Sequence, residues 1–328
     1  MYRRNVSMLW IISVLVLALS LVSFQSVESA DKVIQLIVGT ADIQGSFYPA
    51  GNAISELMRR YDPSVSLSVQ ATAGGIENAR LLAGKNVDIA FLPSDALYQA
   101  VMGMKPFAKK IEINQIMSIF IAPIKFVVLK NSGIKTFADL KGKRVAVNEK
   151  GSTIEVRCRM LLESCGLTYD DIKPLYVPTS QVGDMLINRQ IDMGVGAGAD
   201  PSAWLMDISN RTNIELLNVP EDGIAKTAKS DRTLFRQVIP ANTYKGVDKE
   251  NITVGTTTVV GCAPGLPEDV VYRITKTVLT HKDEFKSFLG ALKGFDNSVA
   301  ASKPFAPWHP GAIKYFKEAG IKYEEFKP

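Results

Sequence analysis

The chain has 328 residues, of which 46% are hydrophobic and 22% charged, so it can bury a large core and two lobes are expected. Its net charge is only +5, and the 38 basic residues are scattered, without Lys/Arg runs interleaved with aromatic residues. This distribution argues against a nucleic-acid-binding surface.

The first thirty residues predict export from the cytoplasm. Arg3 and Arg4 precede an apolar run, Met8–Phe24, which is followed by small and polar residues. A basic start, an apolar centre and a small-residue exit are typical of a signal peptide, with cleavage expected near Ser29 or Ala30. An uncleaved membrane anchor is the alternative, since roughly 17 residues is the lower limit for a span. Either way, we expect the rest of the chain to be periplasmic.

Strand-like and helix-like segments alternate from residue 31 onward. In the first part, strands are expected at 33–39, 66–72 and 87–93, and helices at 47–60, 75–84 and 95–102. After an extended stretch at 116–130, strands are expected at 144–149, 173–178, 191–197 and 213–219, and helices at 153–165, 180–189 and 202–209. Such alternation predicts an α/β protein with parallel sheets covered by helices on both faces.

The last third of the chain is less regular. We expect a helix at 223–236, extended chain at 238–244 and a strand at 255–264. A long helix at 267–289 has Pro at its start and acids in its first turn, which is typical of helix N-termini. A final helix is expected at 312–320.

The two alternations share one layout, which predicts two lobes. Gly45-Ser46 and Gly151-Ser152 each open a helix after the first strand of their half, and Asp88 and Asp192 each lie in an apolar-Asp-apolar strand. We expect residues 30–122 with 256–328 in the first lobe, and 123–255, including the crossings, in the second. A ligand cleft is then expected between the lobes, where strand ends and helix starts converge.

Cysteines and histidines do not form a catalytic or metal-binding pattern. Cys158 and Cys165 lie seven residues apart in an expected helix, ~10 Å along its axis, which exceeds disulfide reach. We interpret these two and Cys262 as small hydrophobic residues. For the two histidines, we expect His281 on a solvated helix face and His309 in a structural role. No metal and no cofactor are predicted.

The first strand–helix turn, Gly39–Gly51 (GTADIQGSFYPAG), is the first candidate ligand site. It lacks the spacing and the lysine of a P-loop, and it lacks the Rossmann glycine pattern. The free N–H groups of the following helix and a serine hydroxyl can still bind a carboxylate. The alternative is that Ser46 only caps the helix. The expected ligand-binding residues of this turn are Thr40, Gln44, Ser46, Phe47 and Tyr48.

Four further polar strand–helix turns would face the same cleft. Taken singly, each is an ordinary capping pattern, so the prediction depends on their number. They contribute Thr72, Gly74, Gly75, Asn78, Ser94, Asp95, Ser152, Thr153, Ala199 and Asp200 as expected ligand-binding residues.

Patterns for catalysis are weak. The chain has no Gly-x-Ser-x-Gly elbow, and the acid pairs Asp170-Asp171 and Glu324-Glu325 lie in polar, surface-like contexts. A hydrolase or transferase would need a His or Lys beside Ser46 or Ser152. We therefore predict a protein that is not an enzyme.

Seven ordered motifs, from about residue 34 to the C-terminus, resemble the TAXI-type solute-binding proteins of tripartite ATP-independent periplasmic (TRAP) transporters. They are GTADIQGSFYPAGNAISELM, ATAGGIENARLLAGKNVDIAFLPSDALYQA, GIKTFADLKGKRVAV, GSTIEVRCRMLLESCGLTYDDIK, LINRQIDMGVGAGA, LPEDVVYRITK and WHPGAIKYFKEAG. The resemblance implies a bilobal periplasmic-binding-protein fold (type II-like), with two lobes of parallel or mixed sheet, a hinge and a cleft between the lobes. It also implies a small carboxylate ligand, either a glutamate-like amino acid or a 2-oxo or dicarboxylate, and delivery of that ligand to a fused membrane permease.

This chain departs from the pattern of that family at expected pocket positions. Asp42-Ile43-Gln44 replaces a glycine-rich stretch, Pro93 replaces a Gln, Thr153-Ile154 replaces Gly-Thr, and Asp200 replaces a Pro. An acid that faced the cleft would disfavour a dicarboxylate and favour a ligand with an ammonium group. Arg157 and Arg159 are candidates to contact a carboxylate, and helical spacing places at most one of them in the cleft.

The function predicted from the sequence is therefore ligand capture by closure of two lobes, in a monomer that partners a TRAP membrane subunit. Two alternatives remain open at this point. One is a periplasmic ligand sensor of the same fold, and the other is an exported hydrolase or transferase that uses the cleft.

Overall fold

The computed structural model describes residues 33–328, and residues 35–328 form one compact unit. The predicted signal peptide and its cleavage position lie outside the described residues. Among the residues that the structure describes, no helix has both the length and the hydrophobicity needed to cross a membrane.

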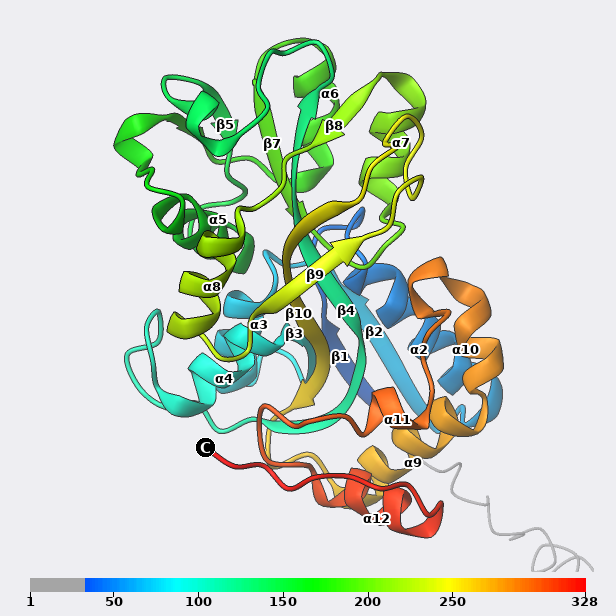
Figure 1. Ribbon diagram of the computed structural model, residues 1–328. Helices are drawn as coiled ribbons and strands as arrows, with labels where there is room; N and C mark the ends of the chain where they lie inside the picture. Colours follow the sequence, from blue (N-terminus) through cyan, green and yellow to red (C-terminus); the bar gives the residue numbers. More distant parts are fainter. Residues whose placement is uncertain (1–32) are drawn as a thin grey trace, which may run out of the picture. The chain divides into compact units, whose positions relative to one another are not determined.

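The described residues form a ten-stranded mixed sheet with the order β2-β1-β3-β10-β4-β7-β5-β6, in which β8 pairs with β4 and β9 with β10 (Figure 1). The strands are β1 (Ile34–Gly39), β2 (Val65–Gln70), β3 (Ile89–Pro93), β4 (Asn114–Leu129), β5 (Arg144–Ala146), β6 (Lys173–Leu175), β7 (Met193–Ala197), β8 (Ile214–Leu216), β9 (Phe235–Ile239) and β10 (Asn251–Cys262). We call β1, β2 and β3 the first end of the sheet, and β5, β6 and β7 the second end.

Two long antiparallel strands, β4 and β10, connect these ends. The C-terminal part of β10 pairs with β3 and its N-terminal part with β9. The N-terminal part of β4 pairs with β10, and its C-terminal part with β7 and β8. Parallel pairing joins β1 to β3 and β5 to its neighbours β6 and β7. The expected extended stretches are therefore confirmed, and their antiparallel pairing makes the sheet mixed, which is one of the two sheet types expected.

Helices cover both sides of each end of the sheet (Figure 1). At the first end, α3 (Gly75–Ala83) and α4 (Ser94–Met102) lie opposite α2 (Phe47–Tyr61), α9 (Glu268–Thr280) and α10 (Lys282–Phe288). At the second end, α5 (Thr153–Ser164) and α8 (Glu221–Ser230) lie opposite α6 (Thr179–Ile187) and α7 (Ala203–Arg211). The remaining helices are α11 (Asn297–Ala300) and α12 (Pro310–Glu318), with single 3₁₀ turns at Phe137–Leu140, Tyr169–Asp171 and Gly290–Leu292.

Apolar periodicity explains why these helices pack where they do. The buried face of α2 contains Ala50, Ile54, Leu57 and Met58, which recur at helical spacing. Ile76, Ala79 and Leu82 form the corresponding face of α3 and pack against a core that includes Leu92 of β3. On α5, Cys158, Leu161 and Leu162 pack against Val145 and Val195.

Two predicted helices differ from the observed ones. The helix expected at 223–236 ends at Ser230, because Asp231 accepts hydrogen bonds from Thr233 and the chain then turns into β9 along β10. The helix expected at 267–289 is interrupted at His281, where the backbone leaves helical geometry between α9 and α10. There the imidazole stacks on Tyr61 with ring centroids 3.4 Å apart, so it is not simply solvated.

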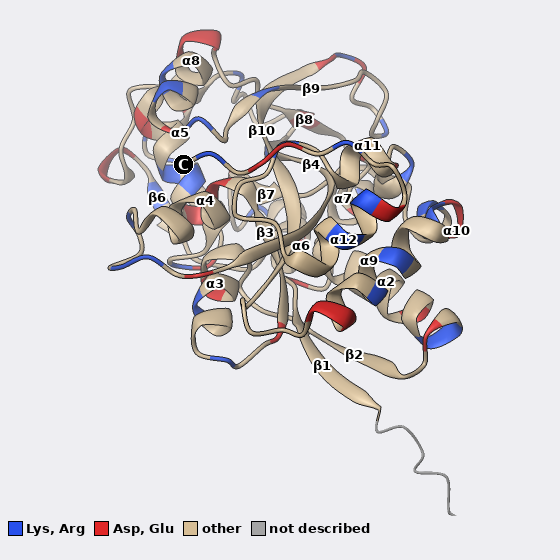
Figure 2. Ribbon diagram, turned by 90° about the horizontal axis from the view of Figure 1, so that it is seen from below, with Lys and Arg blue, Asp and Glu red and all other residues tan. Residues whose placement is uncertain are grey.

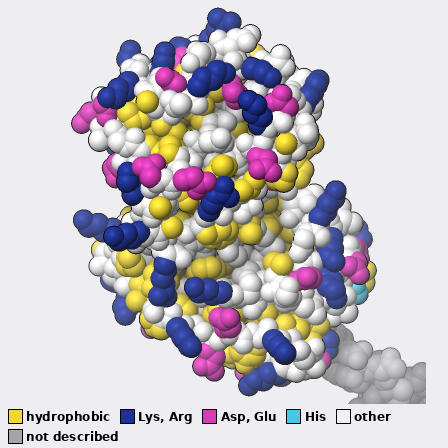
Figure 3. Space-filling view, in the orientation of Figure 1, with side chains coloured by type: hydrophobic (Ala, Val, Ile, Leu, Met, Phe, Trp, Pro, Cys, Tyr) yellow, Lys and Arg dark blue, Asp and Glu magenta, His cyan; other side chains and the backbone are white. Residues whose placement is uncertain are grey.

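Charges are dispersed over the surface. The face drawn in Figure 3 carries Lys/Arg and Asp/Glu side chains side by side. The view from below in Figure 2 shows the same interspersion of both signs on the helices and loops. Neither view shows a region dominated by one sign of charge.

Candidate functional site

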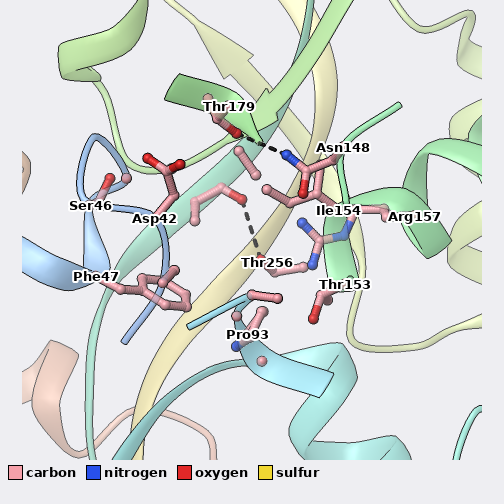
Figure 4. A pocket seen from close by; sticks show the side chains of 18 of the residues that line it. Asp42, Ser46, Phe47, Pro93, Asn148, Thr153, Ile154, Arg157, Thr179 and Thr256 are labelled. Carbon is pink, nitrogen blue, oxygen red and sulfur yellow. Dashed lines mark hydrogen bonds between the residues drawn. The ribbon is translucent and has the colours of Figure 1, made fainter. Parts of the chain in front are cut away.

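A cavity of about 60 Å³ lies between the two ends of the sheet (Figure 4). Its lining includes Asp42, Ser46, Phe47, Gly74, Gly75, Pro93, Asn148, Glu149, Thr153, Ile154, Arg157, Thr179, Gly198 and Thr256. A water molecule occupies about 30 Å³ in the liquid, so this space holds only a few waters and is smaller than common ligand pockets. The walls of the site are therefore close together in this structure.

Four helix N-termini meet at this cavity. Ser46 precedes α2, Gly74 precedes α3, Thr153 begins α5 and Thr179 begins α6. The first N–H groups of a helix have no partner within the helix and favour negative charge. The cavity is therefore suited to an anionic or hydrogen-bond-accepting group.

The α3 turn depends on glycine at Gly75. A Cβ atom there would lie 2.3 Å from Cδ of Pro93 and 3.1 Å from Oγ1 of Thr153. Absence of a side chain thus lets the start of α3 approach both β3 and the start of α5. This close approach allows Oγ1 of Thr153 to accept a 2.9 Å hydrogen bond from the Ile76 backbone N–H.

Further direct hydrogen bonds connect the two sides of the cavity. Oγ of Ser46 accepts from the backbone N–H of Ala199 at 2.9 Å. Oγ of Ser180 donates to Asp42 at 2.7 Å. Ser46 stands at the N-cap position, but its side chain makes no capping bond to α2. Its hydroxyl therefore serves a contact across the site, not helix capping.

A buried ion pair joins α4 to α5 beside the cavity. Nη2 of Arg157 lies 2.7 and 2.9 Å from the two carboxylate oxygens of Asp95, and Nε donates to the same carboxylate at 3.1 Å. Arg157 is 2% exposed and Asp95 4%. Figure 4 shows the guanidinium directed into the cavity, on the side of Thr153 and Thr256. Arg159 instead is half exposed and pairs with Glu155 of its own helix.

Two acids lie on the cavity wall away from that ion pair. Asp42 is half-buried and accepts from the Gln44 N–H as well as from Ser180. Glu149 is half-buried, and burial raises the pKa of its carboxyl, with further raising by the negative charges of Asp42 and Glu77. Figure 4 places Asp42 and Arg157 on opposite sides of the cavity.

Five of the fifteen expected ligand-binding residues line the cavity. They are Ser46, Phe47, Gly74, Gly75 and Thr153.

Four other expected residues do not line the cavity but make hydrogen bonds that hold the strand–helix turns. Thr40, Thr72 and Asn78 form a network in which the Thr40 hydroxyl donates to Gln70 O and the Asn78 amide donates to Thr40 O and Phe91 O. Ser152 caps α5 by accepting from the Glu155 N–H.

The remaining expected residues lie elsewhere. Ser94 accepts from Thr257 N–H, and Asp95 is the partner of Arg157. Gln44 is exposed, and Tyr48 is half-buried without lining the cavity. Ala199 and Asp200 line a separate groove of about 570 Å³ beside Ile121 and Gln237.

Asp200 pairs with Lys125, whose nitrogen lies 2.9 Å from the carboxylate and also donates to Gly198 O. Burial lowers the pKa of the Lys125 ammonium, and the nearby Asp200 charge opposes that shift. The Tyr244 hydroxyl donates to the same oxygen of the Asp200 carboxylate, Oδ1. In this structure the Asp200 carboxylate is thus paired with side chains of the protein and not with the cavity.

Several lining residues were not singled out from the sequence. The Asn148 amide donates to Thr179 at 2.9 Å and accepts from Ser152, with a left-handed φ of 78°. A polar residue two positions after the end of strand β5 could have indicated it. Thr256 lies inside the long strand β10, where no local pattern distinguishes it from its neighbours.

The cysteines and histidines lie away from any reactive arrangement. All three cysteines are unpaired, as predicted; Cys158 and Cys262 are buried, which raises the pKa of each thiol, and Cys165 is half-buried. His309 caps α12 and bonds Leu266 O, which confirms its structural role. Among the hydrogen bonds of the described residues, none joins Ser46 or Ser152 to a His or Lys. Residues 33–328 also contain no cluster of three potential metal-ligating side chains.

Curated relatives match only part of this chain. One, from Brucella abortus (strain 2308), is named "Putative binding protein" and is 28% identical over 178 residues, or 54% of this chain and 52% of that protein. Another, from Haemophilus influenzae, is named "Putative thiamine biosynthesis protein" and is 29% identical over 47% of this chain and 43% of its own length. The chain thus spans about half the length of the curated relatives that it matches.

Solved structures identify the fold. A protein of Bordetella bronchiseptica RB50 aligns with a TM-score of 0.52 at 16% identity, over 91% of this chain and 86% of that one. A mutant of ArgBP from T. maritima aligns with a TM-score of 0.50 at 14% identity, over 80% and 96%. The chain has the mixed α/β fold of periplasmic binding proteins, as predicted. Since the sequence profile of the NMT1-like family matches residues 38–320, the chain belongs to the NMT1-like family.

Proposed function

We propose that this chain is a periplasmic solute-binding protein of the TAXI type, which captures a small carboxylate and delivers it to a TRAP membrane permease. The observation that carries the proposal is the convergence of four helix N-termini and the Arg157 guanidinium on one cavity. The ordered motifs of the sequence support the TRAP assignment. The name of the Brucella relative supports ligand binding.

The chemistry of the cavity suits capture more than turnover. Backbone N–H groups and a guanidinium stabilise a carboxylate without changing it, and a hydrogen bond to a charged group contributes about 1.5–3 kcal/mol. Among the described residues, the hydroxyl of Ser46 accepts a backbone N–H and that of Ser152 bonds Asn148 and Glu155, and no hydrogen bond joins either hydroxyl to a His or Lys that could act as a general base. A nucleophile needs such a base to react. We therefore propose a carrier and not an enzyme.

Hinge closure is the proposed mechanism. In this proposal, residues 30–122 with 256–328 form one lobe, residues 123–255 form the other, and β4 and β10 contain the hinge. Contacts such as Ser46–Ala199 and Thr153–Ile76 would hold the lobes together, and opening would break them. A ligand that bonds both lobes stabilises the closed form by its differential affinity.

A thermal-shift screen of amino acids, 2-oxo acids and dicarboxylates tests the proposal. A true ligand at 100 times its Kd adds about 2.7 kcal/mol of apparent stability, which is readily measured. Replacing Thr153 by the bulkier Phe should remove the shift by filling the cavity. The matched control is Thr243→Phe, because Thr243 is partly exposed and does not line the cavity. No shift with any carboxylate, or an equal shift in both variants, would overturn the proposed site.

A further inference from the structure

We infer that the ligand is a zwitterion, whose carboxylate accepts from Nη1 of Arg157 and whose ammonium group faces Asp42 and Glu149. This inference rests on the proposed function and narrows its ligand class. Amino acids are then the preferred ligands, and 2-oxo acids and dicarboxylates that lack an ammonium group bind poorly.

Arg157 provides the first point of recognition. Nε and Nη2 are both used by Asp95, but Nη1 has no hydrogen-bond partner among the described residues. An arginine that is 2% exposed and leaves one nitrogen unpaired on a cavity wall has donors available for an acceptor. The planar nitrogen fork of a guanidinium suits a carboxylate in particular.

The ion pair with Asp95 limits how much negative charge Arg157 can neutralise. Both side chains are almost fully buried, and three contacts of 2.7–3.1 Å join them. The pair has no net charge, because Asp95 neutralises Arg157. Arg157 therefore binds a ligand through its hydrogen-bond donors and not through an uncompensated positive charge. A second carboxylate on the ligand would find no cation for itself, because the cavity lining of the described residues contains no other Lys or Arg.

Asp42 and Glu149 provide the second point of recognition. None of the ion pairs formed by the described residues includes either carboxylate. Both carboxylates line the same cavity; burial raises the pKa of Glu149, and the negative charges of Asp42 and Glu77 raise it further. A ligand ammonium group relieves this repulsion, whereas a 2-oxo group or a second carboxylate does not.

The arrangement separates the two points across the cavity. Figure 4 shows Arg157 on one side and Asp42 on the other, with the small space between them. One molecule with an acceptor at one end and an ammonium group at the other can reach both. Contact with both sides would also join α2 and its preceding loop to α5, as closure requires.

Matched ligand pairs test the inference by titration calorimetry on the unchanged chain. The pairs are L-alanine with pyruvate, L-leucine with 4-methyl-2-oxopentanoate, and L-glutamate with 2-oxoglutarate, which differ only at the amino or oxo group. We expect the amino member of the pair that fits to bind about tenfold tighter or more. Equal affinity, or tighter binding of the 2-oxo member, overturns the inference and leaves the proposed carboxylate carrier intact. Absence of binding by all six would instead overturn the proposed function.

A double variant, Asp42→Asn with Glu149→Gln, tests which residues make the choice. We expect the preference for the amino member to fall to within about threefold, while the 2-oxo member gains affinity. The matched control is Glu163→Gln with Asp170→Asn, which removes two exposed carboxylates that make no hydrogen bond in the structure. A preference that survives in the first variant, or is lost in the control, overturns the assignment to Asp42 and Glu149.

A ligand that carries only the ammonium group should bind weakly, because recognition also needs the carboxylate. Propylamine and butylamine carry the ammonium group without the carboxylate, so they report on Asp42 and Glu149 separately from Arg157. We expect them to bind at least about tenfold more weakly than the amino acid that fits. Amines that bind as tightly as that amino acid would overturn the role of Nη1 of Arg157.

Discussion

Lys125 and Arg157 are both buried cations paired with an aspartate, but they differ in which hydrogen-bond acceptors their nitrogens contact. Lys125 of β4 is fully buried, and its acceptors are Asp200 and Gly198 O on the loop after β7. That loop also supplies the Ala199 N–H that bonds Ser46. Two nitrogens of Arg157 donate to Asp95, and the third, Nη1, has no hydrogen-bond partner among residues 33–328 and lies at the cavity.

This contrast separates a structural charge from a ligand-binding one. Buried charges are costly unless paired, so both aspartates are needed to keep the cations in place. Where every acceptor belongs to the chain, as for Lys125, the charge positions a loop. Where a nitrogen is left unpaired on a cavity wall, as for Arg157, a ligand can complete the set of hydrogen bonds.

Arg157→Met should have the largest effect. It leaves the Asp95 carboxylate buried and uncompensated, so the free energy of unfolding should fall by about 3–5 kcal/mol in urea titrations. The double variant with Asp95→Leu should regain most of that stability, because an apolar pair can replace a buried ion pair at little cost. Ligand binding should be lost in both. Binding that persists in the stable double variant would place the recognition elsewhere.

Lys125→Met should have a smaller effect on stability and a different effect on binding. The Asp200 side chain is 17% exposed and keeps its bond from Tyr244, so water and that hydroxyl offset part of the loss. We expect the free energy of unfolding to fall by about 2–3 kcal/mol. Calorimetry should show weaker binding overall with an unchanged preference for the amino member of each ligand pair. A changed preference would mean that Lys125 also selects the ligand.

Arg144 and Asp192 form a partly exposed ion pair that serves as a reference. Removing it should have the smallest effect on the free energy of unfolding. Their side chains are 41% and 27% exposed, so Asp192→Asn should lower the free energy of unfolding at pH 7 by about 1 kcal/mol or less. The hydrogen bond from Arg144 lowers the pKa of Asp192 in the folded state.

The lowered pKa determines the sign of the pH dependence. The stabilisation by Asp192 is fully present above the ordinary aspartate pKa of about 3.9 and is lost as the pH falls through the lower folded value. Urea titrations from pH 7 to below pH 4 should therefore show the parent and Asp192→Asn converging in acid. A difference that grew in acid would contradict this assignment.

Features encoded within a few residues were predictable. The positions of α2, α3, α5 and α6 followed from apolar periodicity and from the turn residues before each helix, with ends correct to within about two residues. The cysteine spacing in α5 correctly excluded a disulfide. Helical spacing also predicted that no more than one of Arg157 and Arg159 would face the cleft, and the structure places Arg157 there.

Features that depend on distant partners were not predictable from local patterns. The helix expected from Pro267 is interrupted at His281, whose ring stacks on Tyr61, and β9 pairs along its length with β10. Asp95 was expected at the ligand, but its carboxylate is the partner of an arginine 62 positions away. No local pattern in the sequence predicts a ligand-binding role for Asn148, Glu149 or Thr256, although all three line the cavity.

The sequence by itself therefore determined the alternation of strands and helices, the polar turns at their junctions and the family resemblance, because periodicity and capping act between near neighbours. Only the tertiary structure decided which of those turns meet at one cavity and which charges face it. Contacts such as Ser46–Ala199 and Ile76–Thr153 join residues 153 and 77 positions apart. Pairs this distant are set by how strand ends and helix starts pack in space, where burial makes each unpaired donor or charge costly.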